Sequence, residues 1–132
     1  MVINDPAIVH EIAELYPRYE SALVHNDVET LIAMFWASPH TVRFGAAENL
    51  HGIEEIVAFR KGRSPVNLAR AVERLDIATF GQDFAEVSLE FSRDTGNETV
   101  RGRQSQTWVR LPEGWRIVAA HVSLLPPGPA VV

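Results

Sequence analysis

The chain has 132 residues, 46% hydrophobic and 22% charged, a composition ordinary for one globular domain with its own core. It has no cysteine, which excludes disulfides and cysteine–zinc sites, and its net charge of −5 argues against a nucleic-acid-binding protein. Its start does not look like a signal peptide, and no apolar run reaches the roughly 20 residues of a membrane span. We therefore expect a cytoplasmic protein with neither a membrane nor a nucleic acid as partner.

The first half of the sequence predicts three helices. Asp5-Pro6 is a favourable helix start, because aspartate can cap the first turn and proline fits the first helical position. Apolar residues then recur at three- and four-residue spacing, and Pro17 should bend this helix. A second helix is expected at about 28–36, a short strand at 41–44 and a third helix at about 52–62.

From about residue 67 the hydrophobic period changes to two, which indicates strands. Short turns containing glycine separate these strands, which predicts an antiparallel meander. The expected strands are 68–80, 84–93, 98–110 and 115–124. Helices followed by hairpins are typical of an α+β fold, here three helices packed on a curved, mostly antiparallel sheet. Residues 1–125 would form a single domain, and the proline-rich residues 126–132 a tail.

The last of these strands has apolar residues on both faces. With strict alternation, Ile117 and His121 share one face, whereas Ala120 and Val122 share the other. One face should cover the helices, and the other needs a second cover, most simply a second copy in a symmetric homodimer. We expect His121 to be an interface histidine or a buried structural histidine and not a catalytic base.

Arg43 raises the main question about chemistry, because it stands alone between Val42 and Phe44 in the short strand. If these apolar neighbours face the hydrophobic layer, Arg43 points outward as a solvated charge. If Arg43 points inward, its planar guanidinium suits a carboxylate. Of the 12 basic residues only Lys61 is a lysine. That bias reflects either genome composition or several arginines that recognise carboxylates.

Other familiar kinds of site are missing from the sequence. It has no Gly-x-Ser-x-Gly motif, no phosphate-loop spacing of glycines, and no metal-ligand spacing among its five histidines. We therefore expect no metal and no cofactor. Gln104, Gln106 and Trp108 share one strand face. A buried pair of amides requires hydrogen-bond partners, which favours a polar pocket wall.

The pattern resembles the NTF2-like, or SnoaL-like, superfamily over nearly the whole chain. The most specific part is 114–123, which is similar to the closing strand of that superfamily. Its expected partner strand, 104–110, resembles that of relatives such as the calcium/calmodulin kinase association domain. Further positions are similar to the AtzH-like branch, found in routes that break down cyanuric acid and related ureas. These positions are Phe35-Trp36, Arg43-Phe44-Gly45, Glu48, Gly52 and Phe59-Arg60.

The resemblance implies a cone-shaped fold with a pocket between the sheet and the first helix, and a catalytic pair formed by Tyr19 and Arg43. Tyr19 would donate a hydrogen bond to developing charge or protonate a leaving nitrogen, and Arg43 would hold a substrate carboxylate. Without the resemblance, Tyr19 is a core tyrosine. The other expected substrate-binding residues are Trp36 as an apolar wall, Gln104 and Gln106 as a polar wall, and Arg60 as a second carboxylate anchor. Core packing for Trp36 and a surface charge for Arg60 are the alternatives.

Members of the AtzH-like branch are thought to convert 1,3-dicarboxyurea to allophanate. The resemblance therefore implies a hydrolase of N-carboxy ureas or carbamates that uses positioning and electrostatics without a covalent nucleophile. One alternative is a non-enzymatic small-acid-binding or accessory module for a partner amidase. Another is an isomerase, which needs a carboxylate base near the tyrosine, and Glu48 is the only candidate.

Overall fold

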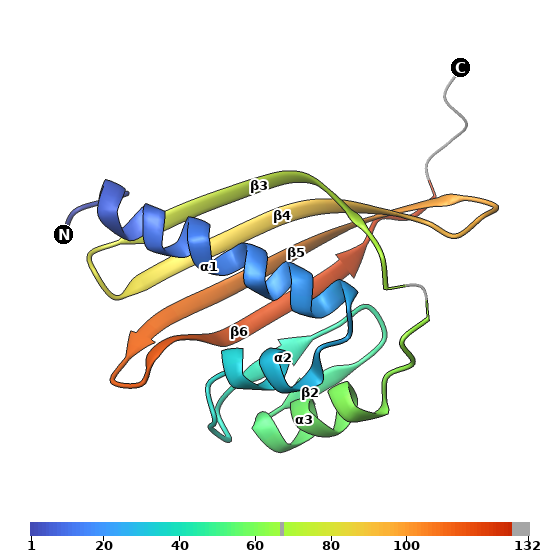
Figure 1. Ribbon diagram of the computed structural model, residues 1–132, viewed down its shortest axis with the longest axis horizontal. Helices are drawn as coiled ribbons and strands as arrows, with labels where there is room; N and C mark the ends of the chain where they lie inside the picture. The colour runs from blue at the N-terminus through green and yellow to red at the C-terminus, as the bar shows by residue number, and fades with distance from the viewer. Residues whose placement is uncertain (67, 128–132) are drawn as a thin grey trace.

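The computed structural model describes residues 1–66 and 68–127 (Figure 1). Residues 128–132 of the expected tail lie outside the described residues. The helices are α1 (Pro6–Val24), α2 (Val28–Met34) and α3 (Ile53–Gly62). None of them has the length and apolar character needed to cross a membrane. The strands are β1 (Val42–Phe44), β2 (Asn49–His51), β3 (Ala71–Phe80), β4 (Phe84–Asp94), β5 (Thr99–Leu111) and β6 (Gly114–Leu124).

The strands lie in the order β2-β1-β6-β5-β4-β3 across one sheet. β1 runs parallel to β6, and the other neighbouring pairs are antiparallel, so that β3 to β6 form the expected meander. α1 crosses the long strands of this sheet (Figure 1). The prediction of an α+β fold with three helices on a mostly antiparallel sheet is confirmed.

α1 begins where the sequence predicts and supplies one wall of the core. The Asp5 side chain accepts a hydrogen bond from the backbone N–H of Ala7 at 3.0 Å, and Pro6 occupies the first turn. This cap satisfies one of the backbone donors left free at the helix start. One face of α1 packs against β4. The buried residues are Ile8, Ile12, Tyr16, Tyr19, Ala22 and Leu23 of α1 and Ala85, Val87, Leu89 and Phe91 of β4.

Some boundaries differ from the prediction. α2 ends at Met34, two residues early, because Phe35 has an extended backbone and bridges to Ile117 of β6. The expected short strand pairs with β2, which the sequence did not predict. β3 begins at Ala71, so that Arg70 lies in the segment before the strand.

A bulge in β6 reverses the alternation expected there. Trp108 pairs with Ile117, whereas the preceding Thr107 pairs with Ala119, so β6 carries one extra residue at this step. Ile117 and Ala120 consequently share the inner face of the sheet, and both are buried. Strict alternation placed them on opposite faces, which is wrong.

The outer face of the sheet, opposite α1, carries His121. This residue is exposed, and its ring lies 5.8 Å from the ring of Phe44, centroid to centroid. His121 is therefore not the buried structural histidine that was one of the two expectations. The homodimer expected from the sequence would cover this outer face, and it stays a prediction.

At Gly102 of β5, an added methyl group would test how tightly the sheet packs against the Phe91 ring. It pairs with Phe91 of β4, and a Cβ atom at Gly102 would overlap the Phe91 ring. Gly102→Ala should therefore displace a buried ring and lower the free energy of unfolding by about 1–3 kcal/mol, as overpacking does. Gly62→Ala is the matched control, because a Cβ there meets nothing within 4 Å. Equal urea midpoints for the two variants would contradict this packing.

Candidate functional site

A pocket of about 260 Å³ lies between α1, the inner face of the sheet and the end of α3. The loop between β1 and β2 closes one side of it. Its lining residues are Tyr19, Leu23, Arg43, Ala46, Ala47, Glu48, Phe59, Arg63, Arg70, Phe91, Arg93, Gln104, Val122 and Leu124. The pocket lies where the AtzH-like resemblance implied one, between the sheet and the first helix.

Arg43 points inward from β1. It pairs with Ala120 of β6, whose side chain faces the core, and only 4% of Arg43 is exposed. Its Nη1 donates to Glu48 Oε1 at 2.8 Å, and its Cζ lies 4.9 Å from the centroid of the Phe59 ring. The Arg43 Nε is buried and has no hydrogen-bond partner among the described residues. One donor of the guanidinium therefore has no acceptor among the described residues.

The apolar neighbours of Arg43 face the other way. The ring of Phe44 lies against His51 and His121, at centroid distances of 5.7 and 5.8 Å. Alternation was therefore the right rule for β1, and of its two alternatives the inward-facing Arg43 is the one found, with Phe44 on the opposite face. These apolar side chains lie on the outer face of the sheet, and the charged Arg43 side chain lies on the inner face.

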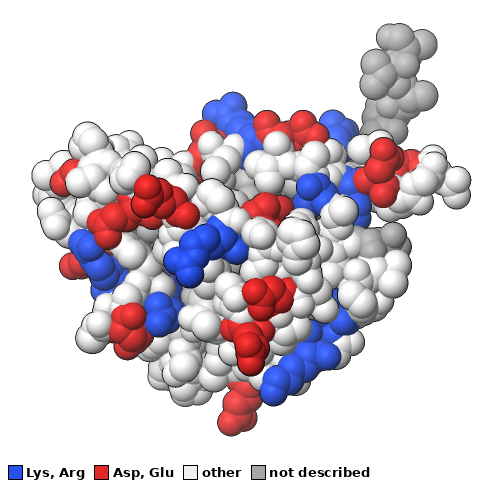
Figure 2. All heavy atoms as spheres, viewed as in Figure 1, with Lys and Arg blue, Asp and Glu red and all other residues white. Residues whose placement is uncertain are grey.

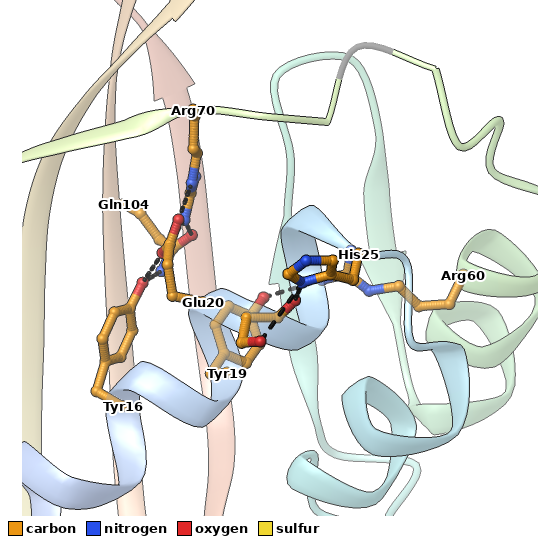
Figure 3. Close-up of polar contacts among 8 residues, drawn as sticks. Tyr16, Tyr19, Glu20, His25, Arg60, Arg70 and Gln104 are labelled. Atoms are coloured by element: carbon orange, nitrogen blue, oxygen red, sulfur yellow. Dashed lines mark hydrogen bonds and ion pairs between the residues drawn. The ribbon is translucent and has the colours of Figure 1, made fainter.

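The two tyrosines of the chain lie side by side on α1 but differ in their hydrogen bonds (Figure 3). Both are 2% exposed, and their ring centroids are 5.9 Å apart. The Tyr16 hydroxyl donates to Glu20 at 2.8 Å and accepts from Gln104 at 3.0 Å. Burial, followed by the negative charge of Glu20, raises the pKa of Tyr16. Tyr16 therefore holds its proton tightly.

The Tyr19 hydroxyl oxygen instead accepts an N–H from Arg60 Nη2 at 3.0 Å. Among the described residues no acceptor takes the Tyr19 proton, and Tyr19 lines the pocket. Burial on its own would raise the pKa of Tyr19, but Arg60, Arg43 and Arg70 outweigh it and lower this pKa below the ordinary tyrosine value. Tyr19 is thus the better proton donor of the pair.

A closed ring of hydrogen bonds fixes the wall beside Tyr19 (Figure 3). Arg70 donates two hydrogen bonds to Glu20, from Nε to Oε2 at 2.8 Å and from Nη2 to Oε1 at 2.9 Å. Arg70 Nη2 also donates to Gln104 Oε1 at 3.0 Å, and the contacts of Gln104 and Glu20 with Tyr16 complete the ring. Burial alone would raise the pKa of Glu20, but Arg70 lowers it. The ring ties α1, the segment before β3 and β5 together.

Five guanidinium groups gather on two phenyl rings. Arg43, Arg60 and Arg63 have their Cζ atoms 4.9, 5.8 and 5.7 Å from the centroid of Phe59. Arg70 and Arg93 lie 4.4 and 6.0 Å from the centroid of Phe91. Both rings line the pocket.

The carboxylates in contact with these guanidinium groups are Glu48 and Glu20, so positive charge dominates the pocket. Burial, followed by repulsion from Arg60, Arg43 and Arg93, lowers the pKa of Arg63 to about 10. On the face seen in Figure 2, by contrast, acidic and basic side chains are interspersed. The excess of positive charge is a local property of the pocket, and it suits an anion with more than one negative charge.

The structure brings some of the expected site residues together. Tyr19, Arg43 and Gln104 line the pocket. Arg60 lies directly behind Tyr19 and is only 1% exposed, so it is not the surface charge that was its alternative. Gln106 is 1% exposed and does not line the pocket; its Oε1 accepts from Trp108 Nε1 at 3.0 Å.

Trp36 lies outside this pocket. Because α2 ends at Met34, Phe35 turns into the core, 6.5 Å from the Tyr19 ring, and Trp36 points away toward His40. Trp36 instead lines a shallow hollow with Glu113 and other residues. It is therefore not placed to form an apolar wall for a ligand held by Arg43.

Sequence reasoning missed Arg63, Arg70 and Arg93 as pocket residues. They come from the end of α3, the segment before β3 and the end of β4. The only sequence signal for them is the preference for arginine over lysine. As for metals, no group of three or more His, Cys, Asp or Glu side chains among the described residues could hold an ion.

Comparison with known proteins identifies the family. A family model described as AtzH-like matches residues 1–128. No curated protein matches the sequence. A solved structure from the DUF3225 family of Pectobacterium atrosepticum, of unknown function, is 50% identical with a TM-score of 0.89, over 94% of this chain and 95% of that one.

Two other solved structures extend the comparison. A cystatin-like fold protein from Burkholderia xenovorans is 48% identical with a TM-score of 0.90, over 97% of this chain and 99% of that one. An NTF2-like superfamily protein from Salmonella enterica is 23% identical with a TM-score of 0.74, over 95% of this chain and 96% of that one, and shows the fold alone. The chain belongs to the AtzH-like family and has the NTF2-like fold.

Proposed function

We propose that the protein is a hydrolase that binds a small dianionic N-carboxy urea or carbamate and removes its terminal N-carboxylate, as in the conversion of 1,3-dicarboxyurea to allophanate. One observation carries the proposal: the Tyr19 hydroxyl oxygen accepts from Arg60, no described residue accepts the Tyr19 proton, and Tyr19 lines a pocket together with Arg43. Membership of the AtzH-like family supports the choice of substrate.

The reaction breaks one C–N bond. The electron pair of that bond stays on the nitrogen, the carboxylate leaves as carbon dioxide, and the nitrogen takes up a proton. Arg43 orients the substrate through a carboxylate. Tyr19 donates its proton to the departing nitrogen, and Arg60 and Arg43 stabilise the tyrosinate until water restores the proton. With the later hydration of carbon dioxide, the net reaction is hydrolysis of the C–N bond.

This scheme requires little from the protein. N-carboxy ureas are labile, so a positioned proton donor and fixed positive charges are sufficient, and no covalent nucleophile is needed. The ring formed by Tyr16, Glu20, Arg70 and Gln104 supplies the rigidity. An isomerase would need a free carboxylate base, but Glu48 is bound to Arg43 at 2.8 Å, which favours the hydrolase.

The contribution of Arg43 can be measured with malonate, an inert dicarboxylate. Arg43→Lys keeps the charge but loses the planar fork, so malonate binding should weaken by about 1–3 kcal/mol, the range for hydrogen bonds to charged groups. Calorimetry provides the affinity. Arg74→Lys is the control, because Arg74 is exposed on β3 and pairs with Asp76 outside the pocket. Equal malonate affinities for the wild type and Arg43→Lys would show that Arg43 does not hold the acid.

The role of Tyr19 can be separated from binding. Tyr19→Phe removes the hydroxyl and keeps the ring, so turnover should fall by about 10²–10³-fold, as for the loss of one oxyanion donor, while malonate affinity changes little. Some stability should also be lost, because Arg60 loses its acceptor. The assay is carbon dioxide release from freshly prepared 1,3-dicarboxyurea, corrected for the spontaneous rate.

Tyr16→Phe is the matched control for Tyr19→Phe. It removes a buried hydroxyl with two hydrogen bonds, so it should cost at least as much stability but far less turnover. Equal losses of turnover in the two variants would contradict proton donation by Tyr19. If the wild type does not accelerate the reaction at all, the same positive pocket supports the alternative, a small-acid-binding or accessory module for a partner amidase.

A further inference from the structure

We propose that Arg63 and Arg93 form a second carboxylate seat in this pocket and make it selective for dianions over monoanions. The proposal rests on the proposed function for the nature of the ligand, and it names the residues that recognise the second charge. Neither residue stood out in the sequence, and neither takes part in the chemistry assigned to Tyr19 and Arg43.

The first argument is that these two arginines lack a partner. Arg43 is paired with Glu48 and Arg70 with Glu20, whereas neither Arg63 nor Arg93 is within ion-pair distance of a carboxylate in residues 1–66 and 68–127. The Arg93 Nε is buried, and no described residue accepts a hydrogen bond from it. Half-buried guanidinium groups without a partner are costly, which points to a ligand as the missing partner.

The second argument is their position. Arg63 follows α3 and lies 5.7 Å from the Phe59 centroid, on the ring that Arg43 also contacts. Arg93 lies near the end of β4, 6.0 Å from the Phe91 centroid. The two side chains come from different elements, and both line the pocket. A small diacid held at Arg43 by one carboxylate therefore has cationic groups within the same 260 Å³ for the other.

The third argument is electrostatic. Arg93 is among the charges that lower the pKa of Arg63, after burial, Arg60 and Arg43, so these side chains repel one another without a ligand. A carboxylate between Arg63 and Arg93 would relieve this repulsion. A monoanion at Arg43 leaves the repulsion between Arg63 and Arg93 in place, which is the physical basis of the selectivity.

Calorimetry with malonate and acetate at constant ionic strength tests the second seat. The wild type should bind malonate at least about 10-fold more tightly than acetate. In Arg63→Gln/Arg93→Gln, malonate affinity should fall by about 10–100-fold, the loss expected for hydrogen bonds to a charged group, while acetate affinity changes by less than about threefold. Arg103→Gln, an exposed charge on β5, is the control and should retain the wild-type preference.

Thermal unfolding shows whether a loss of malonate binding in the double variant comes from a loss of folding. Removing two mutually repelling charges should leave the melting temperature of the ligand-free double variant equal to or above that of the wild type. An unchanged malonate preference in the double variant, or no preference in the wild type, would overturn the second seat. Malonate is inert, so this outcome is independent of turnover. A malonate preference without release of carbon dioxide from 1,3-dicarboxyurea would instead overturn the proposed hydrolase and leave the second seat standing.

Discussion

Repulsion among like charges is the constraint on which the rest of the pocket depends. Burial, followed by neighbouring positive charge, lowers the pKa of Arg63 and Arg93. Without a ligand, the arginines of the pocket therefore repel one another, and other contacts must hold them in place. The frame that holds them consists of the bidentate Arg70–Glu20 pair, the Arg43–Glu48 pair and the two phenyl rings beneath the guanidinium groups. An anion of two charges would reduce this repulsion, so the proposed binding and the proposed specificity depend on the same feature.

The same field distinguishes two tyrosines that lie three residues apart on one helix. The Tyr16 hydroxyl donates a hydrogen bond to Glu20 and becomes part of the frame. Tyr19 receives a hydrogen bond from Arg60, and no described residue accepts its proton. The difference arises from the charge that each hydroxyl meets, since both rings are equally buried. In a fold that hosts many activities, arginines around one phenol can thus lower its pKa.

The sequence predicted the helices and the meander because the periods of 3.6 and two residues persist over long segments. It failed where a single residue decides which face a side chain occupies. One extra residue in β6 moves Ala120 to the face of Ile117, which strict alternation did not predict. Alternation also left the orientation of Arg43 open, and the parallel pairing of β1 with β6 places it inward.

The candidate site was only partly predictable for a related reason. Tyr19 and Arg43 were predicted through resemblance to a family, and the sequence patterns by themselves did not single out Tyr19. Arg63, Arg70 and Arg93 come from three segments far apart in the sequence, and only the folded chain brings them to one pocket. The early end of α2, which sends Phe35 inward and Trp36 outward, is a tertiary effect that the apolar pattern of the helix did not reveal.

Titration of the two phenols tests the central claim most directly, because Tyr16 and Tyr19 are the only 2 tyrosines in the chain. Tyr16→Phe leaves Tyr19 as the sole tyrosine, and Tyr19→Phe leaves Tyr16. Near-ultraviolet absorbance recorded against pH should show Tyr19 ionising below the ordinary tyrosine pKa of about 10 and Tyr16 above it. If Tyr19 ionises at or above that value, the arginines do not make it a proton donor, and the account of the site is wrong.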